Sequence, residues 1–199
     1  MPLMSNIAVL ALLLAGPAAS QGTTEGRGPE KRFISQRYAF SMAVPVGWGV
    51  STGLDTPVYF YAPHAGRFIQ DRIPQSGAVI TVESHDAMSG DARSATTPQA
   101  LALASTRALA SGVPPIEPFR FSKESGASDA VTSSYDEANY SPDLLIQHSI
   151  AVFWQFGSKL FAAHLNYNAN DPKGPTFRRT FFRTIRSLRP LHIDSRPRP

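Results

Sequence analysis

The stretch from Leu144 to Tyr167 reads LLIQHSIAVFWQFGSKLFAAHLNY and decides the fold. Two runs rich in β-branched and aromatic residues flank Gly157 and Ser158, a pair suited to a type II′ turn because glycine tolerates a positive φ at the first turn position. A two-residue turn fixes the register of the strands that it joins. The expected facing pairs are Phe156 with Lys159, Trp154 with Phe161, Val152 with Ala163, Ile150 with Leu165, and His148 with Tyr167.

This register gives the predicted ribbon two unlike faces. One face is almost wholly apolar, and the other carries the polar residues Ser149, Gln155, His164 and Asn166. A slip of one residue would turn those polar side chains into the core. The pattern therefore favours this register over a register that is shifted by one residue.

A helix follows the ribbon, from about Pro175 to Leu188. Its apolar residues recur at steps of four, four and three, which places them on one stripe. The stripe consists of Phe177, Phe181, Ile185 and Leu188. We expect this stripe to dock on the apolar face of the ribbon, and Pro190 to end the helix.

The rest of the chain predicts further strands and one more helix. Thr97 is suited to cap that helix, which runs over residues 100–111, because its hydroxyl can accept an unpaired N–H and Pro98 stands at the first helical position. A turn over residues 46–49 is expected to position Trp48. The predicted strands cover Tyr38–Val44, Val58–Ala62, Ala78–Asp86, Ile116–Ser122 and Ala130–Tyr135. These elements predict the α+β class, with a twisted antiparallel sheet covered by two helices.

The beginning of the chain resembles a signal peptide. Ile7–Ala15 is an apolar run, and a Gly-Pro break and small residues up to Ser20 follow it. A buried N-terminal helix is the alternative, since the first six residues contain no Lys or Arg. The predicted organisation is a signal peptide (1–20), a flexible linker (21–32), one domain (33–190) and a disordered tail (191–199). We therefore expect a secreted or periplasmic protein.

The composition narrows the class of protein. A chain of 199 residues has the size of one ordinary domain, and 42% hydrophobic and 17% charged residues exclude wholesale disorder. No apolar run reaches the length that a membrane-spanning helix needs, so we expect the mature chain to be soluble. The lack of cysteine excludes a disulfide framework, a thiolate metal site and a cysteine nucleophile.

The motifs of several enzyme classes are missing from the sequence. It contains no GxSxG elbow, no glycine-rich phosphate loop, no HExxH helix and no EF-hand loop. His148 and His164 lie on opposite faces of the predicted ribbon, too far apart to share a metal ion. We therefore expect no enzymatic activity, no metal site and no cofactor.

Glu83, His85 and Trp48 form an alternative candidate site. Residues two apart on a strand share a face, so Glu83 and His85 could together bind a cation or move a proton. Trp48 is suited to line a ligand pocket, because an aromatic ring with a polar tip fits one. This alternative would make the chain a small-ligand-binding protein or a hydrolase-like enzyme. A solvated strand face and ordinary core packing are the simpler interpretations of these residues.

Positive charge is concentrated at the C-terminal end of the chain. Residues 171–199 carry a net charge of +6 and the other 170 residues carry −2, which gives +4 in total. The arginines of the predicted helix lie opposite or beside its apolar stripe, and they are Arg178, Arg179, Arg183, Arg186 and Arg189. They predict an anionic partner such as an acidic protein surface, lipid head groups met by peripheral membrane contact, or a polyanion. A solvated helix face is the alternative. Nucleic acid is not expected, because a secreted chain rarely meets it and the aromatic residues are committed to the core.

Three features together resemble the PsbP-like family. They are a strand that ends in PxGW at Pro45–Trp48, a long late hairpin, and a terminal helix with Phe177, Phe181 and Ile185 in loose FxxxFxxIxxSL spacing. The similarity spans roughly Phe33 to Pro190. It implies an α-β-α sandwich with an accessory or assembly role rather than an enzymatic one, and many bacterial relatives are secreted. We therefore expect a non-catalytic binding or assembly protein that uses its basic helix to meet a protein partner or an anionic envelope surface.

Overall fold

The computed structural model describes residues 23–25, 31–52, 57–63, 76–107, 109, 112–138 and 146–191. The predicted signal peptide, most of the predicted linker and the predicted tail beyond Leu191 lie outside the described residues.

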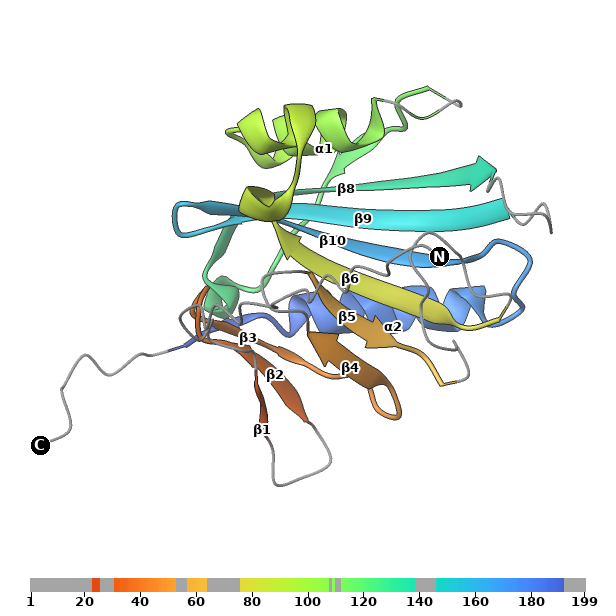
Figure 1. Cartoon of the computed structure of the whole chain (residues 1–199), viewed down its shortest axis with the longest axis horizontal. Helices are drawn as coiled ribbons and strands as arrows, with labels where there is room; N and C mark the ends of the chain where they lie inside the picture. The colour runs from red at the N-terminus through yellow and green to blue at the C-terminus, as the bar shows by residue number, and fades with distance from the viewer. Residues whose placement is uncertain are drawn as a thin grey trace, which may run out of the picture.

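Seven strands of the described residues form a large antiparallel sheet (Figure 1). In sheet order they are β4 (Gly49–Thr52), β5 (Val58–Tyr61), β6 (Ala78–Ser84), β10 (Lys159–Asn168), β9 (Ile146–Phe156), β8 (Ala127–Ala138) and β7 (Ile116–Pro118). The late hairpin thus supplies two of the central strands, and segments far apart in the sequence flank it. Long non-local pairing of this kind is typical of an α+β fold.

The structure confirms the predicted hairpin. Strands β9 and β10 pair in the expected register, so that Trp154 faces Phe161. The two rings stack with their centroids 5.6 Å apart, and both side chains are buried. Gly157 adopts the positive φ (59°) that the turn requires. The turn geometry therefore positions the centre of the core.

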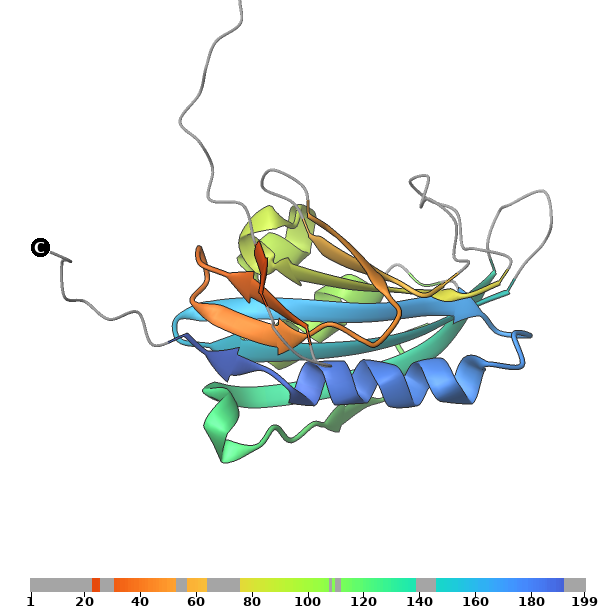
Figure 2. The ribbon, with the colours of Figure 1, turned by 90° about the horizontal axis from the view of Figure 1, so that it is seen from below.

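Two helices and a small sheet cover the large sheet. Helix α1 (Pro98–Thr106) lies on one face, and helix α2 (Gly174–Arg186) lies along the other (Figures 1 and 2). The described strands of the small sheet, in order, are β1 (Thr23–Glu25), β2 (Arg32–Ser35), β3 (Phe40–Ala43) and β11 (Arg189–Pro190). Its buried side chains join the same core as those of α2. The result is an α-β-α sandwich with the larger core on the α2 side.

The stripe of α2 packs as predicted. Phe177, Phe181, Ile185 and Leu188 are all buried in the core beneath the helix. Gly174 begins α2 against Tyr167, because a Cβ at this glycine would lie only 2.7 Å from the Tyr167 ring. This close approach brings the start of the helix tightly onto the end of β10.

Helix α1 covers part of the opposite face of the hairpin. Leu101 and Ala102 of α1 pack with Phe153 and Ala162 of the hairpin in a second, smaller core. Thr97 caps α1 as expected, since its Oγ1 accepts a hydrogen bond from the Ala100 N–H at 3.1 Å.

The N-terminal region differs from the sequence predictions. Strand β1 and the first residue of β2, Arg32, lie within residues 21–32, the segment predicted as a flexible linker. All four residues of strand β3 are buried, although its sequence alternates large apolar residues with small ones. The reason is that β3 lies between β2 and β11 and is also covered by the large sheet. Strand β4 also occurs where no strand was expected.

Strand β6 ends earlier than predicted. The sequence placed His85 on this strand, but His85 begins a 3-10 turn, η1 (His85–Ala87). The η1 backbone no longer follows the two-residue alternation, so His85 does not share the strand face of Glu83. The other described 3-10 turns are η2 (Gly90–Ser94) and η3 (Lys123–Ser125).

Candidate functional site

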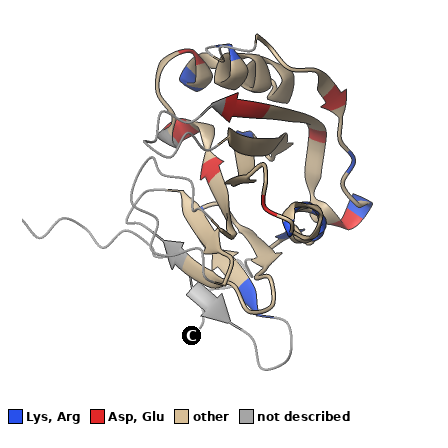
Figure 3. Ribbon diagram, turned by 90° about the vertical axis from the view of Figure 1, so that its right-hand side faces the viewer, with Lys and Arg blue, Asp and Glu red and all other residues tan. Residues whose placement is uncertain are grey.

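The outer face of α2 is a continuous basic surface. Its inward positions are taken by the apolar stripe, which leaves the outward positions of the 13-residue helix to arginine. The exposed arginines are Arg178, Arg179, Arg183 and Arg186, and we call them the α2 basic face. The helix contains no acidic residue, as Figure 3 also shows. These side chains therefore present positive charge along one side of the helix, with no acidic residue of the helix itself among them.

Aromatic rings hold two of these arginines in place. The guanidinium of Arg186 lies 5.3 Å from the ring centroid of Phe119 and 5.6 Å from that of Phe182. Arg178 also lies over the Phe182 ring, at 5.8 Å. A guanidinium stacked on a ring keeps its N–H groups directed around its own edge, where an anion can accept hydrogen bonds from them. The two cations are thus oriented before any partner arrives.

Arg189 does not belong to the α2 basic face, although the sequence grouped it there. It lies in β11 after the helix, and its Nη2 is 3.6 Å from Oε2 of Glu124. Its Nη1 donates to the carbonyl oxygen of Leu188 at 2.8 Å. The positive charge of Arg189 is therefore partly neutralised by Glu124, and the backbone occupies part of its donor capacity.

Trp48 is presented by a tight turn, as the sequence predicted. The Trp48 N–H donates to the carbonyl oxygen of Pro45 at 3.0 Å, and Gly47 has a φ of 78°, which only glycine adopts easily. The turn leaves Val46 86% exposed. The Trp48 ring meets the ring of Phe177 edge to face, with 6.3 Å between centroids.

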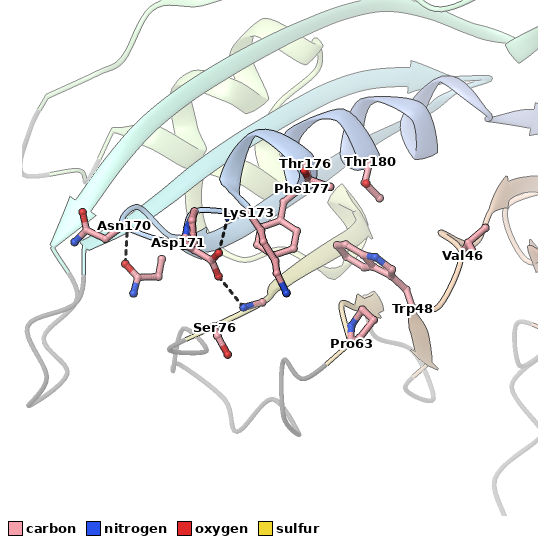
Figure 4. A pocket seen from close by; sticks show the side chains of 13 residues that line it. Val46, Trp48, Pro63, Ser76, Asn170, Asp171, Lys173, Thr176, Phe177 and Thr180 are labelled. Atoms are coloured by element: carbon pink, nitrogen blue, oxygen red, sulfur yellow. Dashed lines mark hydrogen bonds between the residues drawn. The ribbon is translucent and has the colours of Figure 1, made fainter.

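A cleft of about 540 Å³ opens beside Trp48 (Figure 4). We call it the Trp48 cleft. Its apolar wall is formed by Val46, Trp48, Pro63, Pro172 and Phe177. Its polar lining is formed by Ser76, Gly77, Asn168, Asn170, Asp171, Lys173, Thr176 and Thr180. The cleft therefore lies between the Trp48 turn and the first turns of α2.

Asp171 links two of the segments that line this cleft. Its Oδ2 accepts a hydrogen bond from the Gly77 N–H at 3.0 Å, and its Oδ1 accepts one from the Lys173 N–H at 2.8 Å. The carboxylate thus links the start of α2 to the segment before β6. Because backbone donors already engage both oxygens, Asp171 serves mainly to fix the shape of the cleft.

The three residues of the alternative site are not brought together. Glu83 and His85 do not line the Trp48 cleft. Val82 faces the core on the α2 side, so its neighbour Glu83 points to the α1 side of the sheet, away from Trp48. The His85 Nδ1 lies instead 3.5 Å from Oδ1 of Asp86. The grouping of Glu83, His85 and Trp48 into one pocket is therefore wrong.

Glu83 has a different histidine neighbour, which the sequence analysis missed. Its Oε1 lies 3.8 Å from Nε2 of His164, because β6 pairs with β10. Burial raises the pKa of the Glu83 carboxyl and lowers the pKa of His164 to about 4. At neutral pH His164 is thus uncharged, so the two groups form a weakly coupled polar pair rather than a salt bridge.

The lysine at the hairpin turn is engaged with an acidic partner. Lys159 Nζ bonds to Oδ2 of Asp86, and this hydrogen bond is the main cause that lowers the pKa of Asp86. The lysine is therefore neutralised locally, unlike the arginines of the α2 basic face.

Ser134, His148 and Asp136 form a chain of hydrogen bonds across β8 and β9. The His148 Nδ1 bonds to Oδ1 of Asp136, and its Nε2 lies 3.3 Å from the Ser134 Oγ. Asp136 faces His148 directly in the strand pairing. This order of groups is that of a hydrolase triad. The sequence offered no signal for it, because the triad depends on the pairing of β8 with β9, which no short turn fixes.

In the part of the chain that the structure describes, no three His, Asp or Glu side chains gather closely enough to hold a metal ion. No described helix is long and apolar enough to cross a membrane.

Comparisons with known proteins identify the fold. No family model matches the chain, and no curated protein matches it. Among solved structures, the Ran-binding protein Mog1p of Saccharomyces cerevisiae is similar with a TM-score of 0.50 at 12% identity, over 81% of this chain and 95% of Mog1p. The cyanobacterial PsbP of Synechocystis has a TM-score of 0.47 at 14% identity, over 88% of this chain and 100% of that protein.

A protein of Bacteroides thetaiotaomicron is also similar, with a TM-score of 0.48 at 13% identity over 86% of this chain. This chain spans about half of that protein, since the match covers 52% of its length. Identities this low show a shared architecture and nothing finer. The chain therefore has the α-β-α sandwich fold expected from its sequence, and Mog1p shares this architecture.

Proposed function

We propose that the chain is a secreted or periplasmic, non-catalytic binding protein of the PsbP-like kind, which attaches to an anionic partner through the α2 basic face. The observation that carries this proposal is the row of four exposed arginines on a helix without any acidic residue. Clustered cations create a positive potential that attracts and orients an anionic surface.

The helix dipole alone does not account for these arginines. The dipole favours cations near the C-terminus of a helix and disfavours them near its N-terminus. Arg183 and Arg186 fit this rule, but Arg178 and Arg179 lie in the first half of α2, and Lys173 directly precedes the helix. A cationic surface selected for binding explains both halves of the helix, whereas a solvated helix face explains only the second.

The test compares a variant that lacks two charges of the α2 basic face with a variant that lacks two charges elsewhere. Arg179→Gln/Arg183→Gln is compared with Arg93→Gln/Arg107→Gln, whose exposed arginines lie near α1 on the other side of the sheet. Both double variants lower the net charge equally. We expect the α2 variant to elute from a heparin column at a clearly lower salt concentration than the control variant, because local rather than total charge determines retention. Equal elution of the two variants would contradict the proposal.

A second candidate function is the hydrolysis of an activated ester by Ser134. It is favoured by one observation, the hydrogen-bonded order of Ser134, His148 and Asp136. In this scheme the Ser134 Oγ attacks the ester carbonyl while His148 takes its proton, the alcohol leaves with that proton, and water then releases the acyl group.

The measurement is the hydrolysis of p-nitrophenyl acetate. If Ser134 is the nucleophile, Ser134→Ala lowers the rate on the order of 100-fold. The matched control is Ser128→Ala, an exposed serine further along the same strand. An unchanged rate in Ser134→Ala removes this candidate and leaves the binding proposal as it stands.

A further inference from the structure

The Trp48 cleft joins three segments that lie far apart in the sequence. They are the Trp48 turn, the residues on either side of the segment 64–75, and the loop that leads into α2. Hydrogen bonds from Gly77 and Lys173 to Asp171 fasten two of these segments, and the turn fixes the third. A cleft whose walls are fastened in this way binds with little loss of conformational freedom.

The cleft has the size and lining of a binding site for one large side chain. Its volume of about 540 Å³ lies within the usual range of ligand pockets, roughly 300 to 1,000 Å³. Trp48 and Phe177 supply aromatic surface, and aromatic side chains pack favourably against each other edge to face or offset. Val46, an aliphatic side chain that is 86% exposed at the mouth, supplies apolar surface without any described contact partner in the core.

The rim of the cleft carries one lysine, Lys173, and one aspartate, Asp171. Figure 4 shows the Lys173 side chain directed along the opening between Phe177 and Ser76. The Asp171 carboxylate also faces this region, but two backbone N–H groups already hydrogen-bond to it. The Lys173 amine, in contrast, has no described hydrogen-bond partner at this rim. It is therefore the group that an acidic ligand can contact.

The cleft is continuous with the α2 basic face. Thr176 and Thr180 line the cleft, and Arg179 donates from Nη2 to the Thr176 Oγ1 at 3.1 Å. Arg183 follows Arg179 one turn later on the same side of α2. From Lys173 to Arg183 the helix rises about 15 Å. An extended peptide covers that length with about five residues.

We infer that the partner presents an acidic peptide segment, whose aromatic side chain enters the Trp48 cleft while its carboxylates meet Lys173, Arg179 and Arg183. The inference rests on the proposed function and names the chemistry of the partner at the same surface. A bilayer is less suitable as the occupant, because a flat array of head groups matches the arginines but leaves a recessed aromatic cleft unfilled.

The test compares three acetylated peptides, FEEEEE, AEEEEE and FQQQQQ. Binding is followed by isothermal calorimetry and by tryptophan emission, which reports on Trp48 because the other tryptophan, Trp154, is fully buried. We expect FEEEEE to bind about 10-fold more tightly than either other peptide, since each lacks one of the two contacts. Equal affinity of FEEEEE and AEEEEE overturns the inference.

Two variants locate the aromatic contact. Trp48→Ala should abolish the difference between FEEEEE and AEEEEE while leaving retention on heparin unchanged. Because loss of Trp48 could also disturb folding, Val46→Asp serves as a second variant, since its side chain is 86% exposed. It places a negative charge at the mouth of the cleft and should weaken FEEEEE binding about 5-fold. Val113→Asp, which adds the same charge at a 50% exposed valine near α1, is the control and should have no such effect.

The outcomes separate this inference from the proposed function. If the peptides do not bind but vesicles of phosphatidylcholine and phosphatidylglycerol do, and Arg179→Gln/Arg183→Gln abolishes that binding, the inference fails and the proposed function stands. If neither peptides, vesicles nor heparin respond to the arginine variant, both fail. If FEEEEE is preferred and Val46→Asp weakens it while Val113→Asp does not, the inference is supported.

Discussion

The two faces of the large sheet are built differently. The face toward α2 carries a wide aromatic core, in which Trp154, Phe161 and Phe181 are fully or almost fully buried. The face toward α1 has a smaller core, centred on Leu101 and Phe153. The rest of the α1 face holds polar groups that are partly buried, including the pair of Glu83 and His164.

The cause lies in the helices that cover the two faces. Helix α2 presents a phenylalanine at two turns of its stripe, so it fills a deep space above the sheet. Helix α1 is rich in alanine and buries mainly Leu101 and Ala102, so it approaches the sheet closely and covers little of it. A small helix leaves neighbouring strand positions to polar residues, which then bond to one another. Gln147 and Ser149, for example, both donate to Oδ1 of Asn166.

The largest expected effect comes from removing a core side chain on each face. Phe181→Ala should lower the free energy of unfolding by about 3 to 5 kcal/mol, and Leu101→Ala by about 2 to 3 kcal/mol, since the cost follows the volume removed and the cavity left behind. Urea denaturation of both variants measures this difference. An equal or larger loss for Leu101→Ala would show that the α1 face contributes as much to stability as the α2 face.

Acid should destabilise the α1 face through His164. The unfolded chain protonates this histidine near pH 6.5, whereas the folded protein keeps it neutral down to about pH 4. The unfolded state therefore binds the proton first, and the free energy of unfolding falls as the pH decreases from 6.5 to 4. A pKa shift of this size lowers the free energy of unfolding by at most about 3 kcal/mol.

Glu83 reduces this effect, because its raised pKa makes the folded state take up a proton more readily than the unfolded state as the pH falls. Urea denaturation at pH 7 and pH 4.5 measures the net change. His164→Gln should lose less stability on acidification than the original chain does. A pH dependence that His164→Gln leaves unaltered would show that burial of His164 is not its cause.

The cap of α1 should have a smaller effect. Thr97→Ala removes the acceptor of the Ala100 N–H and should cost about 1 kcal/mol. Thr96→Ala, which changes the exposed threonine before it, is the matched control and should cost much less. Thermal denaturation of the two variants separates a cap effect from a general loss of threonine. Similar losses of stability in both variants would show that the Thr97 cap is not the cause.

The smallest expected effects are on the outer side of α2. Arg186→Gln should cost about 0.5 to 1 kcal/mol, because Arg186 stacks on Phe119 and Phe182. Arg183→Gln should change stability by less than about 0.5 kcal/mol, since it makes no such stacking contact in the described structure. Chemical denaturation tests both. A substantial loss for Arg183→Gln would mean that the arginines of this face are structural.

Parts of the candidate site could be predicted from local sequence, and others could not. The arginines of α2 followed from helical periodicity, and Trp48 followed from its turn, so both were placed correctly. The contact of Glu83 with His164 depends on the pairing of β6 with β10, strands about 80 residues apart in the chain. No local pattern encodes that pairing. The Trp48 cleft likewise needs residues from three separate segments.

Sequence by itself determined the β9–β10 register, the stripe of α2 and the concentration of arginine on its outer side. A two-residue turn and a period of 3.6 act over a few neighbouring residues, so they are written in the local sequence. Tertiary structure alone decided that β3 is buried on both sides, that Arg189 meets Glu124, and that His164 rather than His85 lies beside Glu83. The physical reason is that these contacts depend on which distant segments bury each other's apolar surface, a choice made by the whole core at once.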